Sequence, residues 1–148
     1  MAKLFTIFLC LIVLNVTPSL AGHTGVGQTK VVNGRVDVIR GGTTRQLKNG
    51  AKIYHEDFIR TSSGGSIGIT FQDGTTLSLG SDGELTIDDF VYDPAANELS
   101  FVTRLSAGVL TFTTGVIGKL RPEAVRIVTP LANIGIRGTR FIVSVEDP

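Results

Sequence analysis

Two runs of alternating residues, joined by an Asp-Gly pair, constrain the fold of this chain more than any other feature. In residues 66–71 (SIGITF) and 76–79 (TLSL), large apolar side chains take every second position and small or polar ones fill the others. A period of two is typical of a β-strand that buries one face. Asp73-Gly74 lies between the runs, where it favours a tight turn. The pattern therefore predicts a β-hairpin.

The same rhythm recurs along most of the chain and predicts about ten short strands. Further apolar-rich short segments lie at residues 36–39, 85–88, 99–101, 110–113, 125–127, 134–136 and 141–145, and residues 46–53 carry a second turn signal, Asn49-Gly50. Glycine-rich turns separate many of them, and only residues 121–124 (RPEA) could form a single helical turn. Short strands at this spacing indicate an all-β fold, which we expect to be a short β-solenoid-like structure or a twisted β-sandwich.

The first residues have the composition of a signal peptide. Lys3 precedes an unbroken run of eleven mainly apolar residues (4–14), and the small residues of Ser19-Leu20-Ala21 fit a cleavage site after Ala21. A membrane-spanning helix needs about 20 such residues. We therefore expect residues 1–21 to be removed, 22–30 to be flexible and 31–148 to form the β domain, in the periplasm or outside the cell. The alternative is an uncleaved N-terminal anchor.

Composition excludes several kinds of chemistry in the exported chain. The one cysteine, Cys10, lies inside the predicted signal, so the remainder has no thiol nucleophile, disulfide or thiolate metal site. The full chain has 14 Lys and Arg against 13 Asp and Glu, and the loss of Lys3 makes this balance zero. Nucleic-acid binders usually carry a basic surplus. We therefore expect no nucleic-acid partner and no stable membrane span.

Two acidic segments are candidates for metal binding or catalysis. His55, Glu56 and Asp57 are adjacent, but neighbours on a strand point to opposite faces and cannot converge on a metal. We interpret residues 54–57 as a turn that the Asp57 side chain caps. Five carboxylates between residues 82 and 93 could serve a hydrolase or bind calcium, although their alternation with apolar residues is typical of a solvated strand face. We expect no metal and no cofactor.

The segment GIRGTR, residues 135–140, allows two interpretations. Backbone amides of Gly135, Gly138 and Thr139 could form an anion-binding nest, with Arg137 and Arg140 adding charge. The alternative is a corner between two stacked strands, where glycine is needed and Arg137 pairs with a carboxylate or a carbonyl group. We favour the corner. Arg137, Thr139 and Arg140 remain candidates for contact with an acidic partner, and Asp57, Asp73, Gly74, Gly135 and Gly138 are expected to serve turns and corners.

Several segments together resemble the FecR-type domain. They are GRVDVIRGGTTRQLKNGAKIYHEDFIRT, SIGITFQDGTTLSLGSDGELTID, LSAGVLTFTTG and VRIVTPLANIGIRGTRFIVSV, in that order along residues 31–145. The resemblance implies an extracytoplasmic, all-β, non-catalytic module. Well-known members regulate iron uptake by receiving a signal from an outer-membrane transporter and controlling a sigma factor. A signal peptide stands here in place of their anti-sigma segment, so the chain is more similar to stand-alone FecR-domain proteins.

These observations lead to three functional hypotheses. The first is an exported, non-catalytic module that binds a protein of the cell envelope, or a second copy of itself through its edge strands. The second is a module that binds a glycan or an iron chelate on a threonine-rich sheet face. The third is a hydrolase built on Glu84 and Asp88.

Overall fold

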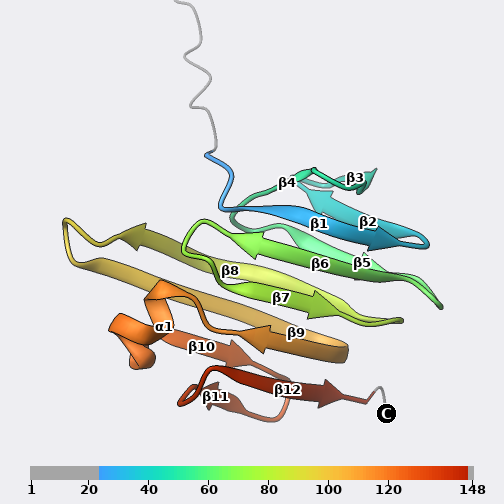
Figure 1. The fold of residues 1–148 in the computed structure, drawn as a ribbon. Helices are drawn as coiled ribbons and strands as arrows, with labels where there is room; N and C mark the ends of the chain where they lie inside the picture. The colour runs from blue at the N-terminus through green and yellow to red at the C-terminus, as the bar shows by residue number, and fades with distance from the viewer. Residues whose placement is uncertain (1–23, 147–148) are drawn as a thin grey trace, which may run out of the picture.

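The computed structural model describes residues 24–146, which form a curled β-sheet whose two halves enclose one core (Figure 1). The predicted signal peptide lies outside the described residues. The twelve strands are β1 (Gly27–Asn33), β2 (Val36–Arg40), β3 (Thr43–Gln46), β4 (Lys52–Ile53), β5 (Phe58–Thr61), β6 (Ser66–Phe71), β7 (Thr76–Leu79), β8 (Glu84–Asp93), β9 (Glu98–Thr113), β10 (Val125–Val128), β11 (Asn133–Gly135) and β12 (Arg140–Val145). The all-β prediction is confirmed.

Strand β9 belongs to both halves of the sheet. Sheet A has the order β4-β1-β6-β7-β9-β12, and sheet B has the order β3-β2-β5-β8-β9-β10-β11. All pairs are antiparallel except β9–β10, which is parallel. The chain passes repeatedly from one sheet to the other, as in a solenoid, while the two sheets pack face to face, as in a sandwich.

Gly108 allows β9 to pass from one sheet to the other. Ala107 is still paired with Glu84 of β8, whereas Gly108 is already opposite Val145 of β12. Gly108 has a φ of 91°, and a Cβ at this position would lie 2.6 Å from the Cα of Gly83. A side chain is therefore excluded both by conformation and by space.

The predicted Asp-Gly hairpin is confirmed, and its apolar residues lie in the core. β6 and β7 pair with Ile69 opposite Leu77. Between the sheets, Phe101 contacts Phe71 and Phe112 edge to face at centroid distances of 4.7 and 5.2 Å. Within sheet A, Phe141 of β12 stacks on Phe112 of β9 at 5.1 Å. Such aromatic pairs add to the free energy gained by burial alone.

Two elements differ from the sequence-based expectation. Residues 27–30, predicted to be flexible, belong to β1, whose buried position is Thr29 rather than an apolar residue. Its hydroxyl donates to the Lys48 carbonyl at 2.6 Å and accepts from the Ala51 amide at 2.9 Å. The helix α1 (Val116–Leu120) was not predicted, whereas the expected single turn is present as the 3-10 helix η1 (Pro122–Ala124). A helix of five residues is too short to show a periodic pattern.

Candidate functional site: the open end of the sheet

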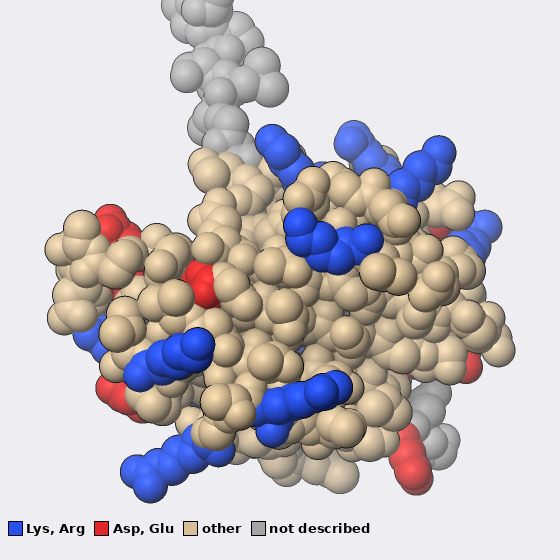
Figure 2. All heavy atoms as spheres, viewed as in Figure 1, with Lys and Arg blue, Asp and Glu red and all other residues tan. Residues whose placement is uncertain are grey.

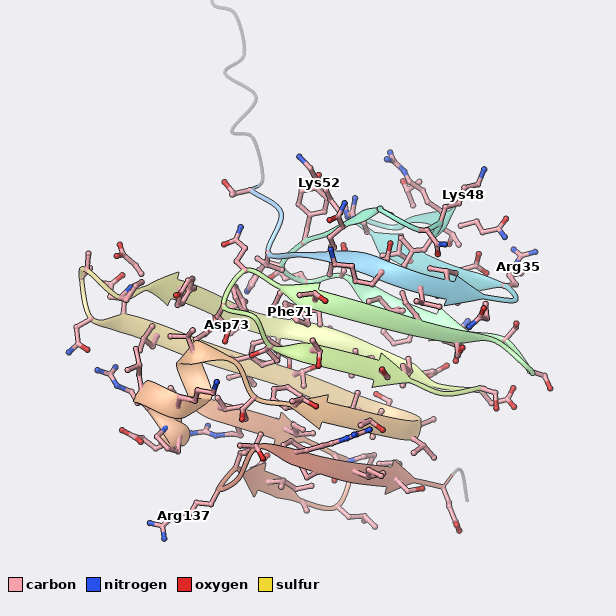
Figure 3. All side chains as sticks on the ribbon, viewed as in Figure 1. Arg35, Lys48, Lys52, Phe71, Asp73 and Arg137 are labelled. Atoms are coloured by element: carbon pink, nitrogen blue, oxygen red, sulfur yellow. The ribbon has the colours of Figure 1, made fainter. Side chains whose placement is uncertain are left out.

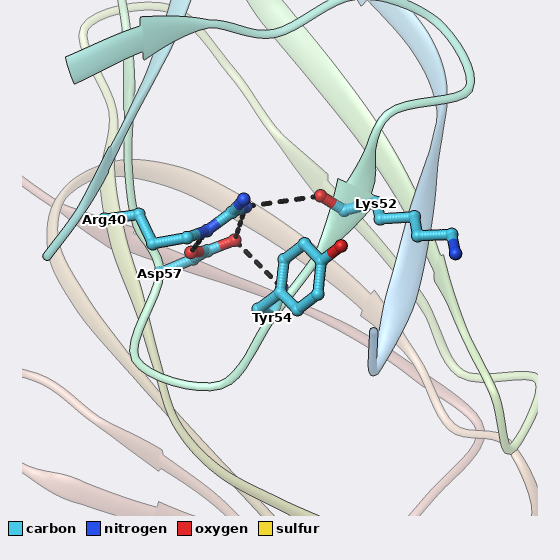
Figure 4. Close-up of polar contacts among 4 residues, drawn as sticks. All are labelled: Arg40, Lys52, Tyr54 and Asp57. Atoms are coloured by element: carbon cyan, nitrogen blue, oxygen red, sulfur yellow. Dashed lines mark hydrogen bonds and ion pairs between the residues drawn. The ribbon is translucent and has the colours of Figure 1, made fainter. Parts of the chain in front are cut away.

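Asp57 ties sheet A to sheet B at one end of the molecule (Figure 4). Its carboxylate is fully buried and accepts two hydrogen bonds from the Arg40 guanidinium of β2, both at 2.6 Å, and one from the Tyr54 amide at 2.9 Å. Arg40 also donates to the Lys52 carbonyl of β4 at 3.3 Å and lies over the Tyr54 ring. We call residues Arg40, Lys52, Tyr54 and Asp57 the clasp.

The clasp satisfies every charge that it buries. The hydrogen bond to Asp57 raises the pKa of Arg40 above its ordinary value, and burial opposes this to a smaller extent. A two-point contact between guanidinium and carboxylate is the strongest geometry available to such a pair. Because the Asp57 carboxylate is occupied by the Arg40 guanidinium and the Tyr54 amide, we interpret the pair as a structural element.

Asp73 fixes the start of α1 against the β6–β7 turn (Figure 3). It is buried, and its carboxylate accepts from the amide and hydroxyl of Thr75 at 3.0 and 2.7 Å and from the Ile117 amide at 3.2 Å. Gly74 follows it with a φ of 81°. Gly115 packs so close that a Cβ there would lie 2.3 Å from the Thr75 nitrogen. The Asp-Gly-Thr sequence thus holds a turn and a helix with the same side chains.

The carboxylates considered for metal binding or hydrolysis lie on exposed strand faces. Glu84 pairs with Arg60 and Asp88 with Arg104, each at 2.9 Å. His55 lies 3.8 Å from Asp89 and 4.0 Å from Glu56. Within residues 24–146, no three His, Cys, Asp or Glu side chains are close enough to hold a metal ion. Glu84 and Asp88 therefore each face an arginine rather than a second carboxylate, and Asp89 accepts from the Ser100 hydroxyl at 2.6 Å.

GIRGTR carries the chain from β11 in sheet B to β12 in sheet A. Gly138 has a φ of 131°, and its carbonyl accepts from the Thr114 hydroxyl at 3.1 Å, while the next carbonyl, that of Thr139, accepts from the Thr114 amide at 2.9 Å. Gly135 is the last residue of β11, and its φ is not positive. A Cβ added to Gly135 would have no neighbouring atom within 4 Å. The structural need for glycine at this corner therefore falls on Gly138 alone.

Arg137 and Arg140 are exposed rather than paired across the corner. Arg137 points away from the body of the molecule (Figure 3), and neither side chain forms an ion pair within the described residues. The expected contact of Arg137 with a carboxylate or a carbonyl is thus absent from residues 24–146. The corner places Arg137, Thr139 and Arg140 on one exposed loop.

A groove runs between the corner and the edge of β12. It measures about 420 Å³ and is lined by Ile134, Gly135, Ile136, Arg137, Phe141, Ile142, Val143 and Ser144. β11 pairs only with β10 and β12 only with β9, so both sheets end here with an unpaired strand edge in the described structure. Ile142 is 67% exposed. We call residues 133–146 the open end.

Two other surfaces differ from the open end in composition. Lysine and arginine gather over the end of the molecule formed by β1–β4 (Figure 2), where Lys30, Arg45, Lys48 and Lys52 are exposed. The outer face of sheet A is rich in serine, threonine and valine and has a shallow groove of about 340 Å³ beside Val31, Ser78 and Val109. The even balance of acidic and basic residues in the sequence does not indicate that basic side chains gather at one end of the molecule.

Sequence reasoning missed the polar partners that hold the fold together. Four side chains form hydrogen bonds with residues at least 17 positions away in the sequence: Arg40, Thr61, Thr75 and Thr114. Thr75 also forms a local hydrogen bond with Asp73. Buried threonines inside apolar alternation were the available signal, because a buried hydroxyl needs a partner.

In residues 24–146, no helix is long and apolar enough to cross a membrane.

Comparison with known proteins found a matching family model and a similar solved structure. A solved structure described as a cell surface anchoring domain is 32% identical, with 41% of this chain and 82% of that chain covered at a TM-score of 0.40. No curated protein matches the chain. The family model described as FecR protein matches residues 57–148, from the clasp carboxylate through the open end. The chain therefore belongs to the FecR family.

Proposed function

We propose that this protein is a non-catalytic binding module of the cell envelope, and that its open end binds a protein partner. The observation that carries the proposal is the edge of β12 that has no strand partner within residues 24–146, beside an apolar groove. An exposed strand edge offers a row of backbone donors and acceptors to an incoming strand, and neighbouring pockets select its side chains. Membership of the FecR family supports an extracytoplasmic location and a role in protein contact.

The charge of the open end indicates the chemistry of the partner. Arg137 and Arg140 are both exposed next to the groove. Basic side chains at the rim of an interface steer acidic partners and set their orientation. The partner is therefore a protein segment with alternating apolar residues and at least one carboxylate near its end.

Quantitative capture from envelope extracts tests this function. The exported chain serves as bait beside two double variants, Arg137→Ala with Arg140→Ala at the open end and Arg45→Ala with Lys48→Ala at the opposite end. We expect a protein that the wild type and the second variant retain and that the first variant loses. If both variants retain the same proteins as the wild type, the open end is not the binding site.

A second candidate function uses the outer face of sheet A. The groove beside Val31, Ser78 and Val109 combines hydroxyl groups with apolar surface, which suits a glycan or an iron chelate. A thermal-shift series with envelope glycans and ferric chelates distinguishes the two candidates. A rise in melting temperature that Ser78→Ala removes would favour the small ligand.

A further inference from the structure

The backbone of β12 shows which of its groups face outward. The Thr114 amide donates to the Thr139 carbonyl at 2.9 Å, and the register continues with Arg140 opposite Thr113. In an antiparallel pair, the residues whose backbone groups bond the neighbour alternate with those whose groups point away. Thr139, Phe141, Val143 and Val145 therefore bond β9, and the free edge presents the amides and carbonyls of Arg140, Ile142 and Ser144.

The side chains of β12 are also sorted by face. Phe141 and Val143 lie opposite the buried Phe112 and Leu110 and pack against the core. Arg140, Ile142 and Ser144 lie on the outer face, and Glu146 follows them with the same parity. The strand thus has one apolar face and one outer face that begins with a cation, and an anion, Glu146, follows directly after its last residue.

We propose that the occupant of this edge is a second copy of the chain, paired antiparallel through β12 about a two-fold axis at Val143. This proposal rests on the proposed function, since both assign protein binding to the open end. It continues sheet A from one copy into the other. An isologous contact of this kind closes on itself and yields a dimer rather than a fibre.

Geometry and charge together select the register. Outward-facing backbone groups must meet outward-facing groups, which limits the axis to positions that bring even-numbered residues opposite one another. An axis at Val143 places Arg140 opposite Glu146 of the other copy, twice, and Ile142 opposite Ser144. An axis at Ile142 would instead place Arg140 opposite Ser144, and an axis at Ser144 would place Glu146 opposite Ile142. Only the Val143 register joins opposite charges.

The same register matches the apolar face. Phe141 of one copy comes opposite Val145 of the other, and the two Val143 side chains meet at the axis. These side chains are only partly buried in the single chain and pack at the edge of the core. Dimerisation would cover them together with part of the groove between β11 and β12. Directly opposed apolar and charged pairs stabilise antiparallel strands.

Charge reversal with sedimentation velocity over a range of concentrations tests the dimer. The exported chain is expected to form a dimer, and Arg140→Glu or Glu146→Arg alone should each weaken it by about tenfold or more, because each creates two like-charge pairs. The combination of both changes restores opposite charges and should return the dissociation constant to within about threefold of the wild type. A wild type that stays monomeric at every concentration, or single variants that dimerise as well as the wild type, would overturn the proposal.

A proline at position 142 tests the edge itself. Because the Ile142 amide points outward, Ile142→Pro removes a donor of the dimer but none of the bonds to β9. It should abolish the dimer, while Ile142→Thr, which keeps the amide, should reduce it only slightly. Thermal unfolding of Ile142→Pro and Ile142→Thr in the Arg140→Glu background shows whether the proline variant is folded. A folded proline variant that still dimerises would overturn the proposal.

The outcomes separate this inference from the proposed function. A monomer that captures another envelope protein through Arg137 and Arg140 would overturn the dimer and leave the binding module intact. A dimer that responds to the charge reversals but captures no other protein would support the inference and limit the partner to the second copy.

Discussion

At the end formed by β2, β4 and β5, the clasp joins sheet B to sheet A through a buried carboxylate, whereas at the open end no side-chain hydrogen bond or ion pair joins β11 to β12 within residues 24–146. Each end of the molecule contains edge strands, β3 and β4 at the first and β11 and β12 at the second. At the first end the charged groups of Arg40 and Asp57 are paired with each other, whereas at the open end Arg137 and Arg140 are both exposed and without an ion pair in residues 24–146. A fold that ties one end tightly can keep the other available for binding without losing its core.

Removal of the Asp57 carboxylate should break the tied end and have the largest effect. Asp57→Ala leaves the Arg40 guanidinium and the Tyr54 amide without their buried acceptor, which should lower the free energy of unfolding by about 4 kcal/mol. Urea denaturation measures the loss. Glu84→Gln, in a largely exposed ion pair with Arg60, is the control and should cost less than about 1 kcal/mol. Equal losses in the two variants would show that the clasp is no stronger than a surface pair.

Gly108→Ala tests the point where β9 passes from sheet B to sheet A, beside the open end. An alanine at this position would have to keep a positive φ, and its Cβ would lie 2.6 Å from the Cα of Gly83. We expect a loss of about 2–3 kcal/mol in urea denaturation. Gly80→Ala is the matched control, since the nearest atom to its Cβ is 3.6 Å away and its conformation suits any residue. A tolerated Gly108→Ala would mean that β9 can bend without glycine.

Shortening a side chain of β12 at the open end should lower the free energy of unfolding less than shortening the side chain opposite it in β9. Val143→Ala removes two methyl groups from a partly buried site and should cost about 1 kcal/mol, whereas Leu110→Ala, at the fully buried position opposite, should cost about 3 kcal/mol. Both are measured under conditions where the chain is monomeric. Comparable losses would place Val143 in a closed core and contradict the open end.

The exposed arginines should have the smallest effect on stability. Arg137→Ala and Arg140→Ala are each expected to change the free energy of unfolding by no more than about 0.5 kcal/mol, because neither side chain supports the fold. Differential scanning calorimetry of the monomer suffices. A large loss for Arg140→Ala would return the arginine to the structural role of a corner residue.

Much of the fold could be predicted from local pattern, and little of the site could. The alternation in β6, β7 and β9 reports burial directly, so strands and the Asp-Gly hairpin are visible in the sequence. The clasp joins Arg40 to Asp57 across 17 positions, and no local rule links them. The sequence suggested that Arg137 pairs with a carboxylate or a carbonyl group, but no such contact is present in residues 24–146. Contacts between distant residues depend on the path of the chain between the sheets, which alternation does not encode.

The shared strand β9 has a consequence for the order of assembly. Every residue of β1 to β8 emerges before β9, yet β7 and β8 can be joined only through it. Until residues 98–113 are available, the edges of β7 and β8 that pair with β9 therefore have no strand partner. Contacts of such long sequence separation form slowly. Until the sixteen-residue strand β9 is available to cover them, these edges can pair with strands of neighbouring molecules.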